Sequence, residues 1–189
     1  MASYTLTAAS PLDGFNVRLD QIAITEVSDR ALVSLAVPNG KQQQLAERIK
    51  TVFAADLPQP GKSAVAQRDS ARLLGLARDQ FFIAFDDHQS DPEAHIKDLV
   101  GETGYVVDQS DSWVMLSVEG ARSRSMLERI CPIDLNPASF AIGDVARTVM
   151  EHHSAIIVRE GEDGYLLLSP RSSAKSFAHA VQVSAESIS

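Results

Sequence analysis

Apolar and amphipathic segments follow one another in the first half of the chain, separated by residues that favour turns. Residues 31–37 form an apolar run that predicts a buried strand, and the Pro-Asn-Gly sequence at 38–40 ends it. Residues 45–53 then repeat large apolar side chains at helical spacing among polar ones. The first folded unit is therefore predicted to begin with a strand and an amphipathic helix.

The same unit is predicted to continue with three strands and a second helix. Residues 72–77 and 81–85 are rich in apolar and aromatic side chains, and the short link between them fits a hairpin. Asp91 and the proline after it predict the start of a helix that Gly101 ends, and residues 104–107 follow as a strand. The order β-α-β-β-α-β is the split, ferredoxin-like pattern, in which two helices cover one face of an antiparallel sheet.

The second half of the chain predicts another α+β unit. Its expected elements are a strand at 113–118, a helix at 121–130, a hairpin of strands at 155–159 and 165–169, and a last helix that begins at Ser172 or Ser173. The predicted fold class is thus α+β, with two consecutive lobes that each contain an antiparallel sheet. The predicted boundaries are an N-terminal arm (1–28), a first lobe (29–108), a second lobe (112–185) and a tail (186–189).

Composition and charge narrow the functions that such a fold can serve. The 189 residues are 44% hydrophobic and 22% charged, which is typical of a globular protein and not of a disordered chain. The formal net charge of -8 opposes binding to a nucleic-acid backbone. Arg122, Arg124 and Arg129 lie close together, but their spacing fits the solvent side of one helix. We therefore expect no nucleic-acid partner.

The cysteine count and the hydropathy pattern indicate the compartment. Cys131 is the only cysteine, so no disulfide can form within the chain. The first ten residues lack the basic and apolar regions of a secretion signal, and no apolar run approaches the ~20 residues of a membrane span. The expectation is a cytoplasmic protein that does not contact a membrane.

No complete motif for catalysis, cofactor binding or metal binding occurs in the sequence. The histidines are the adjacent pair His152 and His153, whose rings would point to opposite faces of a strand, His88 in an acidic loop, and His95 and His179 on predicted amphipathic helices. The Gly-Lys-Ser at 61–63 ends like a phosphate-binding loop, but Asp56 stands where that motif requires glycine. Cys131 lies at the apolar end of a predicted helix, which favours an inert thiol. We therefore predict no catalytic, cofactor-binding or metal-binding residue in this chain.

Two stretches of the second half carry a resemblance. Val-Glu-Gly-Ala-Arg at 118–122 and Met-Leu-Glu-Arg-Ile-Cys-Pro-Ile-Asp-Leu at 126–135 resemble the strand, glycine turn, helix and Asp-Leu exit of the aminomethyltransferase (glycine cleavage T protein) superfamily. Phe-Ala-Ile-Gly-Asp-Val-Ala-Arg-Thr at 140–148 and Ser-Pro-Arg-Ser at 169–172 narrow the resemblance to the gamma subunit family of heterotetrameric sarcosine oxidase. The second lobe is accordingly expected to be aminomethyltransferase-like.

This resemblance implies a function in a larger assembly. Complexes of that family oxidise sarcosine to glycine, yield hydrogen peroxide, and pass the one-carbon unit to tetrahydrofolate or release it as formaldehyde. The family places the flavins FAD and FMN and the NAD on the alpha and beta subunits, tetrahydrofolate on alpha and zinc on delta. The gamma chain is an accessory subunit, so the implied partners are alpha, beta and delta. Arg147 and Arg171 are its possible interface residues, because a guanidinium can make paired bonds to a partner.

Two other classes of function stay open at this point. A free folate-dependent aminomethyltransferase would have Asp144 and Arg147 as its only candidate site residues, and a folate titration of the isolated chain would distinguish it. A regulatory module that senses a small molecule is suggested by the split β-α-β order alone.

Overall fold

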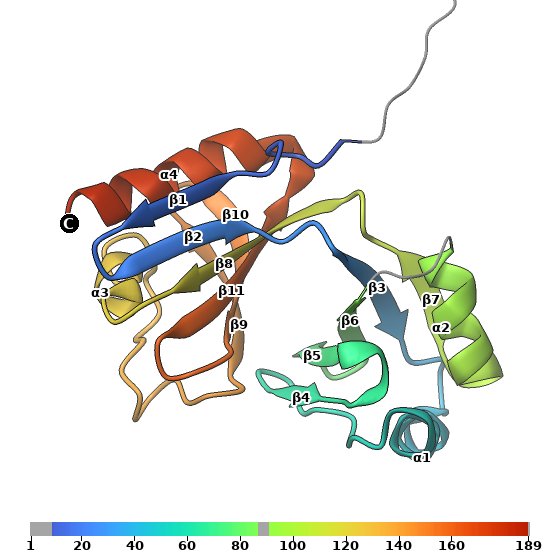
Figure 1. The fold of residues 1–189 in the computed structure, drawn as a ribbon. Helices are drawn as coiled ribbons and strands as arrows, with labels where there is room; N and C mark the ends of the chain where they lie inside the picture. The colour runs from blue at the N-terminus through green and yellow to red at the C-terminus, as the bar shows by residue number, and fades with distance from the viewer. Residues whose placement is uncertain (1–8, 87–90, 189) are drawn as a thin grey trace, which may run out of the picture.

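Two antiparallel β-sheets make up the computed structural model, which describes residues 9–86 and 91–188 (Figure 1). One sheet has six strands in the order β1-β2-β8-β11-β10-β9. Its strands are β1 (Asn16–Leu19), β2 (Ile22–Glu26), β8 (Trp113–Glu119), β9 (Val145–Met150), β10 (His153–Arg159) and β11 (Gly164–Pro170). This sheet is the framework of the second lobe.

The other sheet has five strands and forms the first lobe. Its order is β4-β5-β6-β3-β7, with antiparallel pairing throughout. Its elements are β3 (Arg30–Ala36), α1 (Gln42–Phe53), β4 (Ser63–Val65), β5 (Arg72–Ala77), β6 (Gln80–Asp86), α2 (Pro92–Val100) and β7 (Tyr105–Asp108). Apart from the additional short β4, this is the predicted split pattern. The Asp91 side chain accepts a hydrogen bond from Ala94 N at 2.9 Å, which confirms the predicted start of α2.

The helices of the second lobe are α3 (Ser123–Leu127) and α4 (Ala174–Glu186). The helix predicted over residues 121–130 is therefore shorter than expected, because turns occupy both of its ends. Short 3-10 segments complete the set: η1 (Arg68–Ser70), η2 (Gly101–Thr103) and η3 (Arg171–Ser173). Of the helices in the described ranges, none is long and apolar enough to cross a membrane.

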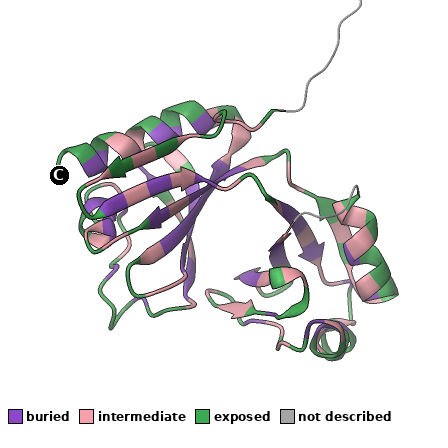
Figure 2. Ribbon diagram, in the orientation of Figure 1, coloured by how far each residue is buried: buried purple, intermediate pink, exposed green. Residues whose placement is uncertain are grey.

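Three apolar clusters join these elements into four layers (Figure 2). One cluster, with Leu167 and Phe177, fills the space between the six-stranded sheet and helices α3 and α4. A second, with Ile49 and Phe85, lies between the five-stranded sheet and helices α1 and α2. The third, the inter-sheet cluster, contains Leu32, Leu74, Phe82 and Ala84 from the first lobe and Met115, Val145, Ile156, Val158, Leu166 and Leu168 from the second. The two sheets therefore pack face to face, with the helices outside.

Residues 16–26, which the sequence analysis assigned to an N-terminal arm, form β1 and β2 instead. β2 pairs with β8, so both strands extend the sheet of the second lobe (Figure 1). Their apolar side chains alternate, and Ile22 and Ile24 are buried in the cluster under α4. The first lobe is therefore an insertion between β2 and β8, and the predicted second lobe of residues 112–185 is incomplete without β1 and β2.

The loop before β4 makes a second connection between the lobes. Ser63 N donates to Gly143 O at 2.6 Å and Val145 N donates to Gly61 O at 2.9 Å, on either side of an antiparallel bridge between Lys62 and Asp144. Arg72 of β5 also lies 2.9 Å from the Glu160 carboxylate in the β10–β11 hairpin. Backbone pairing and an ion pair thus fix the orientation of the two sheets.

We predict that Gly120→Ala strongly destabilises the chain. Gly120 has a φ of +118°, and a Cβ there would lie 2.2 Å from Gln21 O in the β1–β2 turn. The free energy of unfolding, measured by urea denaturation, should fall by about 2–4 kcal/mol. Gly161→Ala is the matched control, because the nearest atom to its Cβ would be 3.9 Å away. Equal unfolding midpoints for the two variants would contradict this account.

Candidate subunit interface

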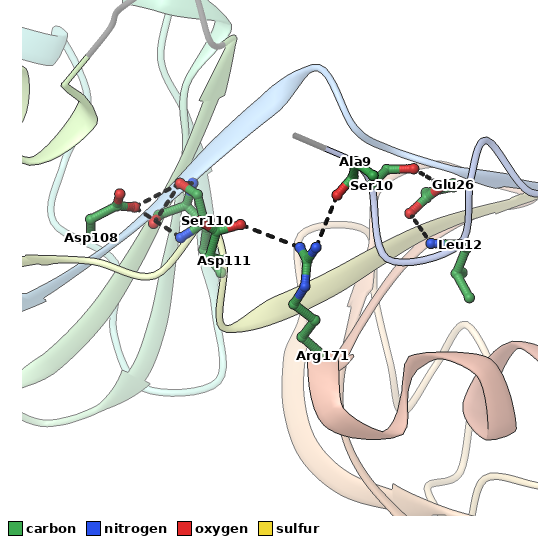
Figure 3. Close-up of polar contacts among 9 residues, drawn as sticks. Ala9, Ser10, Leu12, Glu26, Asp108, Ser110, Asp111 and Arg171 are labelled. Carbon is green, nitrogen blue, oxygen red and sulfur yellow. Dashed lines mark hydrogen bonds and ion pairs between the residues drawn. The ribbon is translucent and has the colours of Figure 1, made fainter. Parts of the chain in front are cut away.

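Arg171 lies where the N-terminal segment meets the link between the lobes (Figure 3). It follows β11 directly and opens η3, which directs its side chain across the β7–β8 link. Nη1 lies 3.3 Å from Asp111 Oδ1, and Nη2 donates to Ala9 O at 2.9 Å. The Asp111 side chain is 99% exposed, so water screens this ion pair and it is weak. Arg171 therefore connects three segments of its own chain.

The buried carboxylate of Glu26 holds the N-terminal loop beside Arg171 (Figure 3). It accepts hydrogen bonds from Ser10 Oγ at 2.8 Å, Leu12 N at 3.0 Å and Gly14 N at 2.8 Å. Bonds to an ionised acceptor are stronger than neutral ones, so this loop is well anchored at the end of β2. The sequence analysis missed this residue; the signal was an acid that continues the buried alternation of Ile22 and Ile24.

Arg147 has a different environment from Arg171. It lies on β9, the outermost strand of the six-stranded sheet, and its side chain is exposed beside Val149, which is 50% exposed. Within residues 9–86 and 91–188 the Arg147 side chain has no hydrogen bond or ion pair. Of the two arginines predicted as interface residues, Arg147 is thus the one whose guanidinium is available to a partner. The structure does not bring it together with Arg171, whose bonds are made within the chain.

Asp144 has both carboxylate oxygens engaged within the chain. Oδ1 lies 2.6 Å from Lys62 Nζ, and Oδ2 accepts a hydrogen bond from Ala141 N at 3.0 Å. Asp144 is 8% exposed, and its two partners come from different lobes. A pterin that used this acid would have to displace one of these bonds, so the geometry assigns Asp144 to the contact between the lobes.

Arg159 is another charged residue that the sequence analysis missed. It ends the apolar run of β10 and is 4% exposed. Its guanidinium donates to Phe140 O at 2.7 Å, Glu162 O at 3.1 Å and Gly161 O at 3.2 Å. Three carbonyl oxygens satisfy the buried cation and fix the hairpin that carries Glu160. Its role is to position this hairpin.

The histidines do not form a metal centre in the described part of the chain. His152, His153 and His179 line one hollow of about 450 Å³, but no group of three or more His, Cys, Asp or Glu side chains there could hold a metal ion. His153 Nε2 lies 2.8 Å from Ser176 Oγ, and His95 Nε2 lies 2.8 Å from Asp69 Oδ2. His88, considered above for a metal, lies outside the described residues.

Two solved structures share the fold of this chain. A chain of the heterotetrameric sarcosine oxidase from Corynebacterium sp. U-96, in complex with pyrrole 2-carboxylate, matches with a TM-score of 0.75 and 22% identity, over 90% of this chain and 88% of that chain. The glycine cleavage system aminomethyltransferase T from Bartonella henselae matches with a TM-score of 0.64 and 16% identity, over 85% of this chain and 45% of that chain. At such identities these matches establish the fold, which is aminomethyltransferase-like.

Sequence comparison identifies the family. The model of the sarcosine oxidase gamma subunit family matches residues 42–186, well over half of the chain. The chain therefore belongs to the sarcosine oxidase gamma subunit family.

Three named relatives are sarcosine oxidase gamma subunits. The one from Corynebacterium sp. strain P-1 is 28% identical over 83% of this chain and 73% of its own length. Those from Arthrobacter sp. and Corynebacterium sp. strain U-96 are 25% and 29% identical over 64% and 53% of this chain. The chain spans only 59% and 49% of the length of these two relatives.

The Cys131 thiol yields a prediction about pH. Cys131 is 5% exposed, and burial raises the pKa of its thiol above the usual 9.0, although hydrogen bonds from the Ile133 backbone and the Thr148 side chain partly oppose the shift. Because the folded pKa lies above the unfolded one, the contribution of this thiol to stability is complete below pH 9 and is lost as the pH rises through the folded pKa. The free energy of unfolding of wild type and of Cys131→Ala should be measured from pH 7 to about pH 11, a range that begins below the usual thiol pKa and extends above it. The stability advantage of wild type should shrink at high pH; an unchanged difference across this range would refute the assignment.

Proposed function

We propose that this chain is the accessory gamma subunit of a heterotetrameric sarcosine oxidase. The complex oxidatively demethylates sarcosine to glycine, with hydrogen peroxide as one product and formaldehyde or 5,10-methylenetetrahydrofolate as the other. The observation that carries the proposal is the match of the gamma subunit family model to residues 42–186. The matches to named gamma subunits and to the solved oxidase support it.

In this proposal the alpha, beta and delta subunits are the partners of the chain and hold the cofactors. FAD, FMN, NAD, tetrahydrofolate and zinc are bound there, and this chain contributes no catalytic residue. The contacts of its polar residues support an accessory role. Three charged side chains are bonded within the chain, where they position loops and join the lobes: Asp144, Arg159 and Glu26.

The alternative of a free folate-dependent aminomethyltransferase has less support. Asp144, one of its two candidate residues, is engaged by Lys62 and Ala141. The Arg147 side chain has no bond to another described residue, but an exposed guanidinium serves an interface equally well.

Expression with and without the other subunits tests the proposal. Co-expressed with alpha, beta and delta, the chain should purify in one flavin-containing complex that oxidises sarcosine, as measured by native mass and by hydrogen peroxide formed per flavin. Purified alone, the chain should bind neither flavin, zinc nor tetrahydrofolate. A flavin spectrum of the isolated chain, or a folate titration that saturates at one equivalent, would overturn the accessory role.

A further inference from the structure

β9 ends the six-stranded sheet, so one side of its backbone has no neighbouring strand after its first residue. Val145 N donates away from β10, to Gly61 O. The pairing of β9 with β10 is regular from Val145 to Met150, and backbone groups alternate in direction along an antiparallel strand. The N–H and C=O groups of Arg147 and Val149 therefore also point away from β10.

Most of these outward groups lack a partner within residues 9–86 and 91–188. The Val149 carbonyl accepts a 3.3 Å bond from the Thr148 hydroxyl, and the pairing rules leave the two N–H groups and the Arg147 carbonyl open. Unpaired backbone groups on an edge strand are a template for another strand. β9 thus has the backbone chemistry for strand addition.

A segment of the chain itself pairs with the start of this edge but not with the rest of it. The bridge between Lys62 and Asp144 is antiparallel, and the bond from Ser63 N to Gly143 O continues it on one side. On the other side Gly61 N donates to Gly75 O of β5 instead of to β9, so the segment turns away from the edge. The intrachain segment consequently covers the edge only up to Val145, and the ladder direction is open from Arg147 onward.

The side chains of the open edge define what can bind there. Alternation along β9 places Arg147 and Val149 on the same face as Val145, which is buried in the inter-sheet cluster. Where the first lobe no longer covers this face, it exposes the Val149 side chain and the Arg147 guanidinium, which has no partner among the described residues. A strand laid on this edge would place its own side chains directly beside them.

We propose that the open edge of β9, residues 146–150, binds an extended strand of another subunit that carries a carboxylate beside Arg147 and an apolar residue beside Val149. The inference rests on the proposed function, because the occupant belongs to the proposed complex. A second copy of this chain fits less well, since antiparallel pairing of β9 with itself about Arg147 sets the two Arg147 side chains side by side. It would also join two chains of net charge -8.

The test uses two variants of β9, co-expressed with the alpha, beta and delta subunits. Val149→Pro deletes an outward N–H that the sheet does not use, at a position where edge strands tolerate proline. Val149→Ala keeps this N–H and shortens the side chain, so it separates the backbone contribution from the apolar one. Arg147→Glu reverses the charge, and Arg18→Glu is the matched control on β1, the opposite edge of the same sheet, where Arg18 is also exposed. Thermal unfolding of each isolated variant establishes that it is folded.

We expect Val149→Pro and Arg147→Glu to lower the yield of assembled complex by about tenfold or more, with Arg18→Glu near wild type and Val149→Ala between the two. Assembly of all four variants at the wild-type level would overturn the β9 site and leave the proposed function intact. Failure of wild type itself to join a complex would instead defeat the proposed function, and the inference with it. A wild-type homodimer that Arg147→Glu dissociates would show that the occupant is a second copy, which contradicts the proposal.

Discussion

The apolar contact between the two sheets is the interaction on which the rest of the structure depends. Burial of each large side chain of the inter-sheet cluster contributes about 1.5–3 kcal/mol, whereas an exposed ion pair contributes at most about 1 kcal/mol. Phe82 packs edge-on against Trp113, with ring centroids 5.5 Å apart, where the chain enters the second lobe. With the sheets packed in this way, the loop at 61–63 reaches β9 and Arg72 reaches Glu160. These polar contacts then select one orientation of sheets that apolar packing alone would allow to slide.

The arginines show that the place of a side chain in the two packed sheets determines which groups it binds. Arg159 is buried and donates to three backbone carbonyls, whereas Arg72 makes an ion pair across the junction of the lobes. Arg171 ties the N-terminal loop to the β7–β8 link. Arg147, on the outermost strand, has no such neighbour in the part of the chain that the structure describes. Arg159, Arg72 and Arg171 are thus bonded within the chain, whereas the Arg147 side chain is exposed on the open edge of the second lobe.

Local patterns in the sequence predicted the first lobe well because turn and cap residues mark the ends of its elements, even though β3 pairs with the distant strands β6 and β7. The hairpin of β5 and β6 and the start of α2 at Asp91 are of this kind. β1 and β2 escaped prediction because Asp20 and Gln21, which join them in a hairpin, lack the Gly or Asn of the usual turn signals, and β8, the other partner of β2, comes only after the entire first lobe. A short alternation such as that of Ile22 and Ile24 does not reveal which strand will cover it. The candidate interface was predicted as residue types, but only the structure separates the engaged Arg171 from the open Arg147.

The insertion of the first lobe between β2 and β8 has a consequence for biosynthesis. When β2 leaves the ribosome its partner strand has not been made, and an isolated two-stranded hairpin is marginally stable in water. The first lobe emerges next and contains its own core, so it can fold while the chain is still being elongated. To complete the six-stranded sheet, β2 must then pair with β8, and the whole first lobe lies between them in the sequence. Contacts of such long sequence separation form slowly. Until that step Ile22 and Ile24 remain open to solvent, so the β1–β2 hairpin can associate with other chains while the first lobe is being made.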